Sequence, residues 1–140
     1  MIDFNYETTF SLEDIELWSN WLRSVIDNED RLEGELNYIF CDDKYLHKLN
    51  LEYLNHDTFT DIISFDYSVG NRLHGDIYIS VDRVLDNAKT YGIGFKRELA
   101  RVMVHGILHL CGYKDKSSAD IIIMRGKEDA YISQFAGLEA

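Results

Sequence analysis

The sequence predicts an α/β (α+β) fold: a single compact domain over residues 1–140, with a small mixed sheet of about four strands packed by helices. Four segments show the alternation or the β-branched runs of strands, and segments with apolar residues three and four positions apart lie between and after them. The helical segments accumulate toward the C-terminus. The 46% hydrophobic and 13% aromatic content is sufficient for one core and excludes a disordered chain.

The N-terminal part of the chain predicts a strand followed by a helix. Residues 2–6 alternate between apolar and polar side chains, as in a half-buried strand. Ser11-Leu12-Glu13-Asp14 has the form of a capping box, so we expect the helix to begin there and to end near Asn28. Its apolar positions recur at helical spacing: Leu12, Ile15, Trp18, Leu22 and Val25.

A second strand and helix are expected next. Glu35–Cys41 is rich in residues that favour strands, and Asp42-Asp43 supplies a helix start directly after it. Residues 55–60 are polar and predict a loop. The apolar positions of the helix before this loop are Tyr45, Leu46, Leu49 and Tyr53.

Two short β-rich runs follow the polar loop. They are Ile62–Phe65 and Ile77–Ser80, and Gly70-Asn71 with neighbouring polar residues separates them. Because a glycine-containing connection of this kind favours a hairpin, we expect the two strands to pair.

The remainder of the chain has helical periodicity. One helix is expected to stop at Tyr91-Gly92, and a second runs from about Phe95 to Cys111, where Gly112 is well placed to end it. Ser117 or Ser118 can cap a last helix. The apolar stripe of the second helix is Phe95, Leu99, Val102, Met103, Gly106 and Leu110, and the last helix carries Ile121, Ile122, Met124 and Ile132.

The formal charge of −11 disfavours a general affinity for nucleic acid or for anionic membranes, because such binding rests on positive potential. No stretch approaches about 18 apolar residues, and the N-terminus lacks the pattern of a signal peptide. Two cysteines, Cys41 and Cys111, are too few for a disulfide framework. We therefore expect a cytoplasmic protein with no membrane partner.

The charge is distributed unevenly along the chain. Residues 89–127 contain eight basic and three acidic residues, a net charge of +5, so the remainder carries −16. Any contact with RNA is therefore expected to be local and selective.

The basic region contains a candidate metal site at a helix end. His105 and His109 are four residues apart, which stacks both imidazoles on one face of a helix. A chain that reverses at Gly112 can bring the carboxylate of Asp115 back beside the last helical turn. Two histidines and one aspartate suit zinc, and three protein ligands leave a fourth position for water.

A plainer interpretation is that the two histidines are an accident of helix composition, which is the more common origin of such a pair. The metalloprotease signature needs a glutamate directly after the first histidine, and Gly106 occupies that position. Peptide hydrolysis by that mechanism is therefore disfavoured. Glu98 lies two helical turns before His105, where it could orient a ligand, although a solvated carboxylate is the simpler expectation.

The stretch HGILHLCGYKDK, residues 105–116, resembles the signature HGxLHLxGYDH of the YbeY family of bacterial rRNA-maturation endoribonucleases. Residues 60–65, TDIISF, are similar to the family's TDVLSF, and residues 75–80, GDIYIS, to its GDIxIS. With Leu49-Asn50 and Tyr53, the resemblance covers about half the chain in the right order. It implies a metal-dependent endoribonuclease.

The resemblance assigns the family's first two metal-binding histidines to His105 and His109. Its third histidine falls on Asp115, and the aspartate before it falls on Lys114. The family's arginine after the position of Tyr53 falls on Leu54. One Zn²⁺ ion remains the expected cofactor, while the carboxylate makes the site harder and gives Mn²⁺ or Fe²⁺ more weight.

The leading hypothesis is an endoribonuclease that acts on ribosomal RNA during maturation of the small ribosomal subunit, with metal-activated water attacking a phosphodiester. Lys114 and Lys116 flank the third ligand and are expected to contact the RNA backbone. Asp61 is a candidate proton acceptor. Two alternatives remain: a ribosome-associated assembly factor with a mainly structural metal, motivated by Leu54, and a metal-dependent hydrolase of peptides or small molecules.

Overall fold

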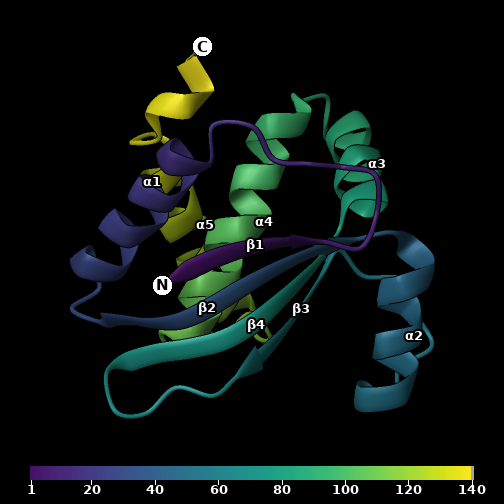
Figure 1. Ribbon diagram of the computed structural model, residues 1–140, viewed down its shortest axis with the longest axis horizontal. Coiled ribbons are helices and arrows are strands. Elements are labelled where there is room, and N and C mark those ends of the chain that lie inside the picture. Colours follow the sequence, from purple (N-terminus) through teal and green to yellow (C-terminus); the bar gives the residue numbers. More distant parts are fainter. Residues whose placement is uncertain (140) are drawn as a thin grey trace.

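Strands and helices follow one another along the chain in the predicted order (Figure 1). The computed structural model describes residues 1–139, so Ala140, the last residue of the expected domain, lies outside the described residues. The elements are β1 Ile2–Tyr6, α1 Ile15–Asn28, β2 Leu32–Cys41, α2 Asp43–Leu54, β3 Ile62–Asp66, β4 Arg72–Ser80, α3 Val81–Tyr91, α4 Phe95–Leu110, α5 Ser118–Ile132 and the 3-10 helix η1 Ala136–Glu139.

The four strands form one mixed sheet in the order β1-β2-β4-β3. The β1/β2 and β2/β4 pairs are parallel, and the connection within each pair contains a helix: α1 in the first, and α2 followed by β3 in the second. The expected pairing of the two short β-rich runs is confirmed: β3 and β4 are antiparallel, with Ile63 opposite Tyr78. The predicted fold class, an α+β domain with a small mixed sheet, is confirmed.

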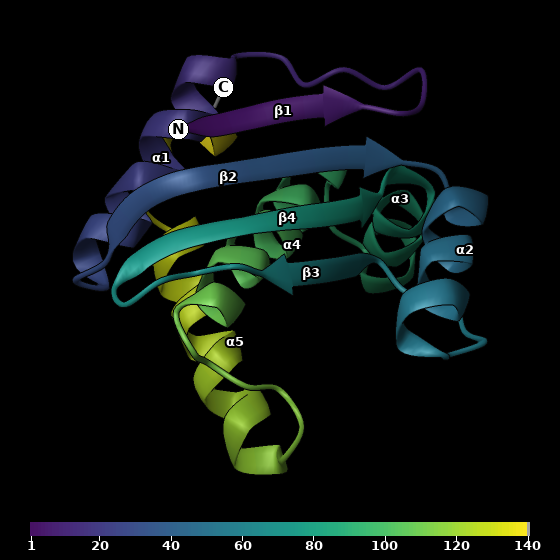
Figure 2. The same ribbon diagram turned by 60° about the horizontal axis from the view of Figure 1, so that its bottom comes forward.

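The helices cover the two faces of the sheet unequally. α4 contacts β3, β4 and three helices, α1, α3 and α5, so it lies at the centre of the main layer (Figure 1). α2 lies against the other face, where Leu46 packs with Cys41 and Ile63. Figure 2 shows that the N-terminal end of α5 projects beyond the sheet.

α4 approaches the sheet closely at Gly106. A Cβ atom at this position would lie 3.0 Å from two side-chain carbons of Ile77 and 3.2 Å from Ile62. The glycine therefore lets the helix lie directly on β3 and β4. As a result, the histidines on either side of Gly106 in the sequence are held against a rigid sheet.

The predicted start of the first helix is wrong. α1 begins at Ile15, and its N-cap residue is Asp14 in a left-handed conformation, with φ of 53° and no side-chain capping bond. The backbone N–H of Leu12 donates instead to the hydroxyl of Tyr6 at 3.2 Å, and the Leu12 side chain enters the core outside any helix. Burial of Leu12 and this hydrogen bond replace the capping box at Ser11.

Two further expectations need correction. β2 begins at Leu32, earlier than Glu35, because the N–H of Leu32 pairs with the carbonyl of Asn71 at 2.8 Å. β4 begins at Arg72, earlier than Ile77, because its parallel pairing with β2 extends to Leu32. The capping of α5 by Ser117 is confirmed, and it forms a capping box with Asp120.

Both cysteines are buried free thiols, in agreement with the expectation of a chain without disulfides. Burial raises the pKa of the Cys41 thiol to about 12 and that of Cys111 to about 11. Among the helices of residues 1–139, none combines the length and the apolar character needed to cross a membrane.

Candidate metal centre and its cavity

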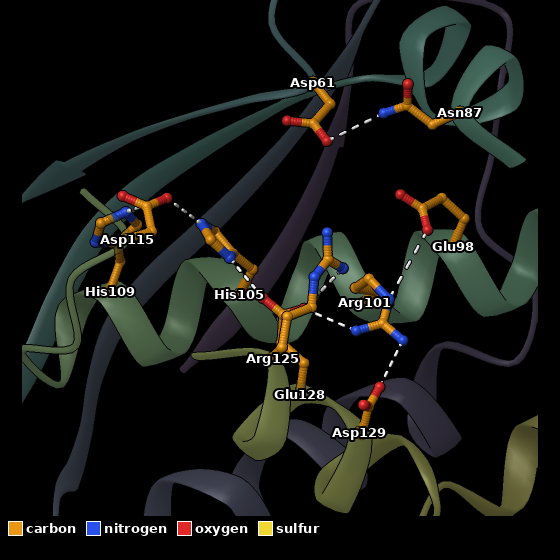
Figure 3. Close-up of polar contacts among 10 residues, drawn as sticks. All are labelled: Asp61, Asn87, Glu98, Arg101, His105, His109, Asp115, Arg125, Glu128 and Asp129. Carbon is orange, nitrogen blue, oxygen red and sulfur yellow. Dashed lines mark hydrogen bonds and ion pairs between the residues drawn. The ribbon is translucent and has the colours of Figure 1, made fainter. Parts of the chain in front are cut away.

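The structure brings His105, His109 and Asp115 together at the C-terminal end of α4 (Figure 3). The Nε2 atom of His105 lies 3.3 Å from Oδ2 of Asp115, and Nε2 of His109 lies 3.6 Å from the same oxygen. One donor atom from each residue falls within 4.8 Å of the others. Two imidazole nitrogens and one carboxylate oxygen at this spacing can hold a single divalent ion.

The loop that carries Asp115 is anchored at several points. Gly112 adopts φ of +104°, which turns the chain back after α4, and the N–H of Tyr113 donates to the carbonyl of Leu108 at 3.1 Å. The hydroxyl of Tyr113 donates to Glu29 at 2.7 Å, and Arg31 donates to the carbonyl of Cys111 at 2.8 Å. The end of α1 therefore determines where the loop lies.

The second ring nitrogen of His105 is already committed to a protein partner. Its Nδ1 atom lies 2.7 Å from Oε2 of Glu128, whose side chain is only 3% exposed. When Nδ1–H donates to a carboxylate, Nε2 is left with its lone pair free for a metal ion. The donor set therefore fits a divalent metal in type and in orientation. Burial opposes the charged form of His105, but Glu128, Asp115 and Asp61 outweigh it and raise the pKa of the imidazole.

A charged network holds Glu128 in place. Arg101 donates to Oε1 of Glu128 at 2.8 Å and to Asp129 at 2.6 Å. Glu98 is 3% exposed and lies 3.9 Å from Nε of Arg101, so the expectation of a solvated carboxylate is wrong. Burial raises the pKa of Glu98, with Arg101 opposing the shift. Glu98 therefore pairs with Arg101 of this network and not with His105.

A cavity of about 650 Å³ adjoins the metal-binding group. The three candidate ligands line one part of it, and Asp61, Asn87 and Glu98 line another. Asp61 precedes β3 and receives a hydrogen bond from the amide of Asn87 at 3.3 Å (Figure 3). Burial raises the pKa of the Asp61 carboxyl, with His105 as the largest opposing influence.

The other residues singled out in the sequence lie around this cavity or outside it. Leu54 lines the wall and is exposed. Lys114 and Lys116 are exposed on the loop beside Asp115 and are not among the residues that line the cavity.

Sequence reasoning missed Glu128, Arg101, Arg125 and Asn87. One signal was available for Glu128: it lies four residues after Met124 and three before Tyr131, both buried, so a carboxylate occurs on the core face of the last helix. A charged residue at such a position needs a partner. The sequence does not reveal that the partner is His105, on another helix.

A family model and the individual relatives found by comparison with known proteins carry the same family name. Residues 3–136 match the family model described as Endoribonuclease YbeY. Relatives named Endoribonuclease YbeY include one from Flavobacterium johnsoniae, 63% identical over 96% of this chain and 97% of its own, and one from Flavobacterium psychrophilum, 57% identical over 96% of each. The solution structure of TM1509 from Thermotoga maritima superimposes with a TM-score of 0.67 at 25% identity, covering 98% of this chain and 90% of that one.

Proposed function

Because the chain belongs to the YbeY endoribonuclease family, we propose that residues 1–140 act as one domain, a metal-dependent endoribonuclease that cleaves ribosomal RNA during maturation of the small ribosomal subunit. The observation that carries this proposal is the convergence of His105, His109 and Asp115 beside a cavity of about 650 Å³. The assembly-factor and peptide-hydrolase alternatives have no comparable support among the relatives' names.

Zinc is the proposed metal. His105 and His109 would bind it through Nε2 and Asp115 through a carboxylate oxygen. When bound by these residues, such an ion would supply a lowered pKa for its water and electrostatic stabilisation of the negative charge that develops on a phosphodiester. The role of the protein would be to hold two ligands on the last turns of α4 and the third on the anchored loop after it, and to fix the tautomer of His105 through Glu128.

Asp61 is the proposed proton acceptor. Its carboxylate lines the same cavity as the metal ligands, and Asn87 holds one of its oxygens, so the other oxygen is available to substrate or water. A carboxyl whose pKa is raised by burial is a better base than a fully solvated one. Asp61 would therefore take a proton from the attacking nucleophile.

Lys114 and Lys116 are proposed to contact the RNA backbone outside the cavity. Both side chains are exposed beside Asp115, in the part of the chain with net positive charge. Contacts of this kind orient an RNA strand without reading its sequence. We propose a cytoplasmic location, since ribosomal RNA is processed there.

The test is cleavage of transcripts that together cover the precursor of the small-subunit RNA. Purified protein is assayed with and without chelator, alongside a His109→Ala variant and a matched His56→Ala control, because His56 is exposed and outside the cavity. Cleavage should require metal, fall by at least about 100-fold in H109A and persist in H56A. Cleavage that resists the chelator and survives in H109A would refute the proposal.

A further inference from the structure

The two arginines of the cavity differ in how much of their hydrogen-bonding capacity is already used. Arg101 is 14% exposed and is paired with Glu128 at 2.8 Å, Asp129 at 2.6 Å and Glu98 at 3.9 Å. Arg125 is 54% exposed and makes one ion pair, at 3.4 Å, with Glu128. A guanidinium has five N–H donors, so Arg125 keeps most of its donors for a ligand.

A cation with free donors on the cavity wall would favour the entry of an RNA phosphate. Five carboxylates line the cavity and each repels a phosphodiester: those of Asp61, Asp66, Glu98, Asp115 and Glu128. The charge of Arg101 is compensated by its own three partners. Within the described chain, Arg101 and Arg125 are the only lysine or arginine side chains on the wall, where Leu54 contributes no charge.

The position of Arg125 is set by the same residue that orients a metal ligand. Glu128 is one helical turn after Arg125 in α5, and its Oε1 accepts from both arginines while its Oε2 faces Nδ1 of His105. Figure 3 shows the guanidinium of Arg125 above Glu128, on the side that faces Asp61. Arg125 therefore lies beside the metal ligands but has its own access to the cavity.

We propose that Arg125 binds the phosphate of the RNA at the point of cleavage. Its planar N–H fork would donate to the non-bridging oxygens of that phosphate and would bind them more tightly as negative charge develops. The guanidinium keeps all its protons throughout, so its role is electrostatic. This inference rests on the proposed function, because it assigns the substrate-phosphate contact of the same site.

The experiment compares Arg125→Gln and Arg125→Lys with an Arg97→Gln control. Arg97 is exposed on the first turn of α4 and outside the cavity, so R97Q removes the same charge from elsewhere. Three quantities are measured: kcat and KM for RNA cleavage by the zinc-loaded protein, the salt dependence of RNA binding by the metal-free protein, and zinc affinity.

In R125Q, we expect kcat/KM to fall on the order of 100-fold, mainly through kcat. A loss of this size is typical when an enzyme loses one hydrogen-bond donor to the negative charge that develops in the transition state. R125K should recover part of the loss, because it keeps the charge without the fork. The slope of log affinity against log salt should fall by about one in R125Q. Zinc affinity should stay within about threefold of the wild type, and R97Q should cleave RNA like the wild type.

Two results would overturn the inference. One is a kcat/KM of R125Q within about threefold of that of R97Q, together with an unchanged salt slope. The other is a fall in zinc affinity of R125Q by the same factor as the fall in its cleavage activity. That result would mean that Arg125 acts only by supporting Glu128. If wild-type protein cleaved none of the transcripts, the proposed function would fail, while the salt slope of RNA binding would still decide the role of Arg125.

Discussion

Glu128 uses both of its carboxylate oxygens, one for His105 and one for the arginines, and it does so while 3% exposed. A buried carboxylate without partners would be costly, and the ion pair with Arg101 at 2.8 Å offsets this cost. The contact between Glu128 and Nδ1 of His105 at 2.7 Å in turn orients the imidazole ring. The contact with Glu128 thus leaves Nε2 of His105 facing Oδ2 of Asp115, as the proposed metal site requires.

We predict that Glu128→Ala lowers zinc affinity by about 10- to 100-fold, because His105 loses the partner that fixes its tautomer and ring orientation. The matched control is Asp129→Ala, which removes the other strong partner of Arg101 but leaves the contact with His105 intact. Competition with a chromophoric chelator measures both affinities under conditions where both variants are folded. Equal affinities in E128A and D129A would contradict the role assigned to Glu128.

At the scale of the element, the helical repeat of α4 places core residues on one face and the two candidate metal-binding histidines at the edge of that face. Its stripe of Leu99, Met103, Gly106 and Leu110 is buried, while His105 and His109 lie at the border of that stripe and remain accessible from the cavity. Gly106 explains why the helix can do both: without a Cβ atom it lies on Ile62 and Ile77, and the neighbouring turns are held at a fixed height above the sheet.

We predict that Gly106→Glu, which would create the His-Glu-x-x-His pattern of metalloproteases, destabilises the fold by at least about 3 kcal/mol. The Cβ atom of the new side chain would lie 3.0 Å from Ile77 and 3.2 Å from Ile62, closer than ordinary van der Waals contact. The substitution would also bury an unpaired carboxylate. Gly126→Glu is the control, since Gly126 is exposed in α5 with open space around it. Urea unfolding gives both values. A G106E variant as stable as G126E would show that the close packing at Gly106 is not required.

At the scale of the whole molecule, the core and the metal-binding group are separate. The main core joins α1, α4, α5 and the sheet through buried apolar side chains, and neither candidate metal-binding histidine nor Asp115 belongs to it. The part of the sequence with net positive charge contains all three candidate ligands, although Asp61, Asp66 and Glu128 from the acidic remainder also line the cavity. We therefore expect the folded state not to depend on the metal, and we expect RNA binding to be local.

We predict that metal removal leaves the protein folded. Chelation should lower Tm by several degrees while the cooperative transition is retained, because zinc at 100 times its dissociation constant adds about 2.7 kcal/mol to a fold that the core already stabilises. Thermal melts by circular dichroism, with zinc added back as the control, measure this. Loss of the cooperative transition on chelation would instead favour a structural metal.

The sequence by itself predicted those parts of the protein that depend on near neighbours along the chain. The i, i+4 spacing of His105 and His109 and the reversal at Gly112 are local, so they predicted that Asp115 returns to the two histidines, while contacts with Glu29 and Arg31 anchor the loop that carries it. The strand and helix periodicities are local as well, and they were sufficient for the fold class and for most element boundaries. The predicted start of α1 failed because Leu12 and Tyr6 make a contact that the capping motif does not anticipate.

Only the tertiary structure decided which distant residues complete the site. Glu128 and Arg125 reach it because α5 packs on α4, and Asp61 reaches it because β3 takes the edge of the sheet beside β4. Their spacing in the sequence carries no information about these distances. Helix and strand patterns repeat over a few residues, whereas the packing of one element on another is set by the shape of the whole core.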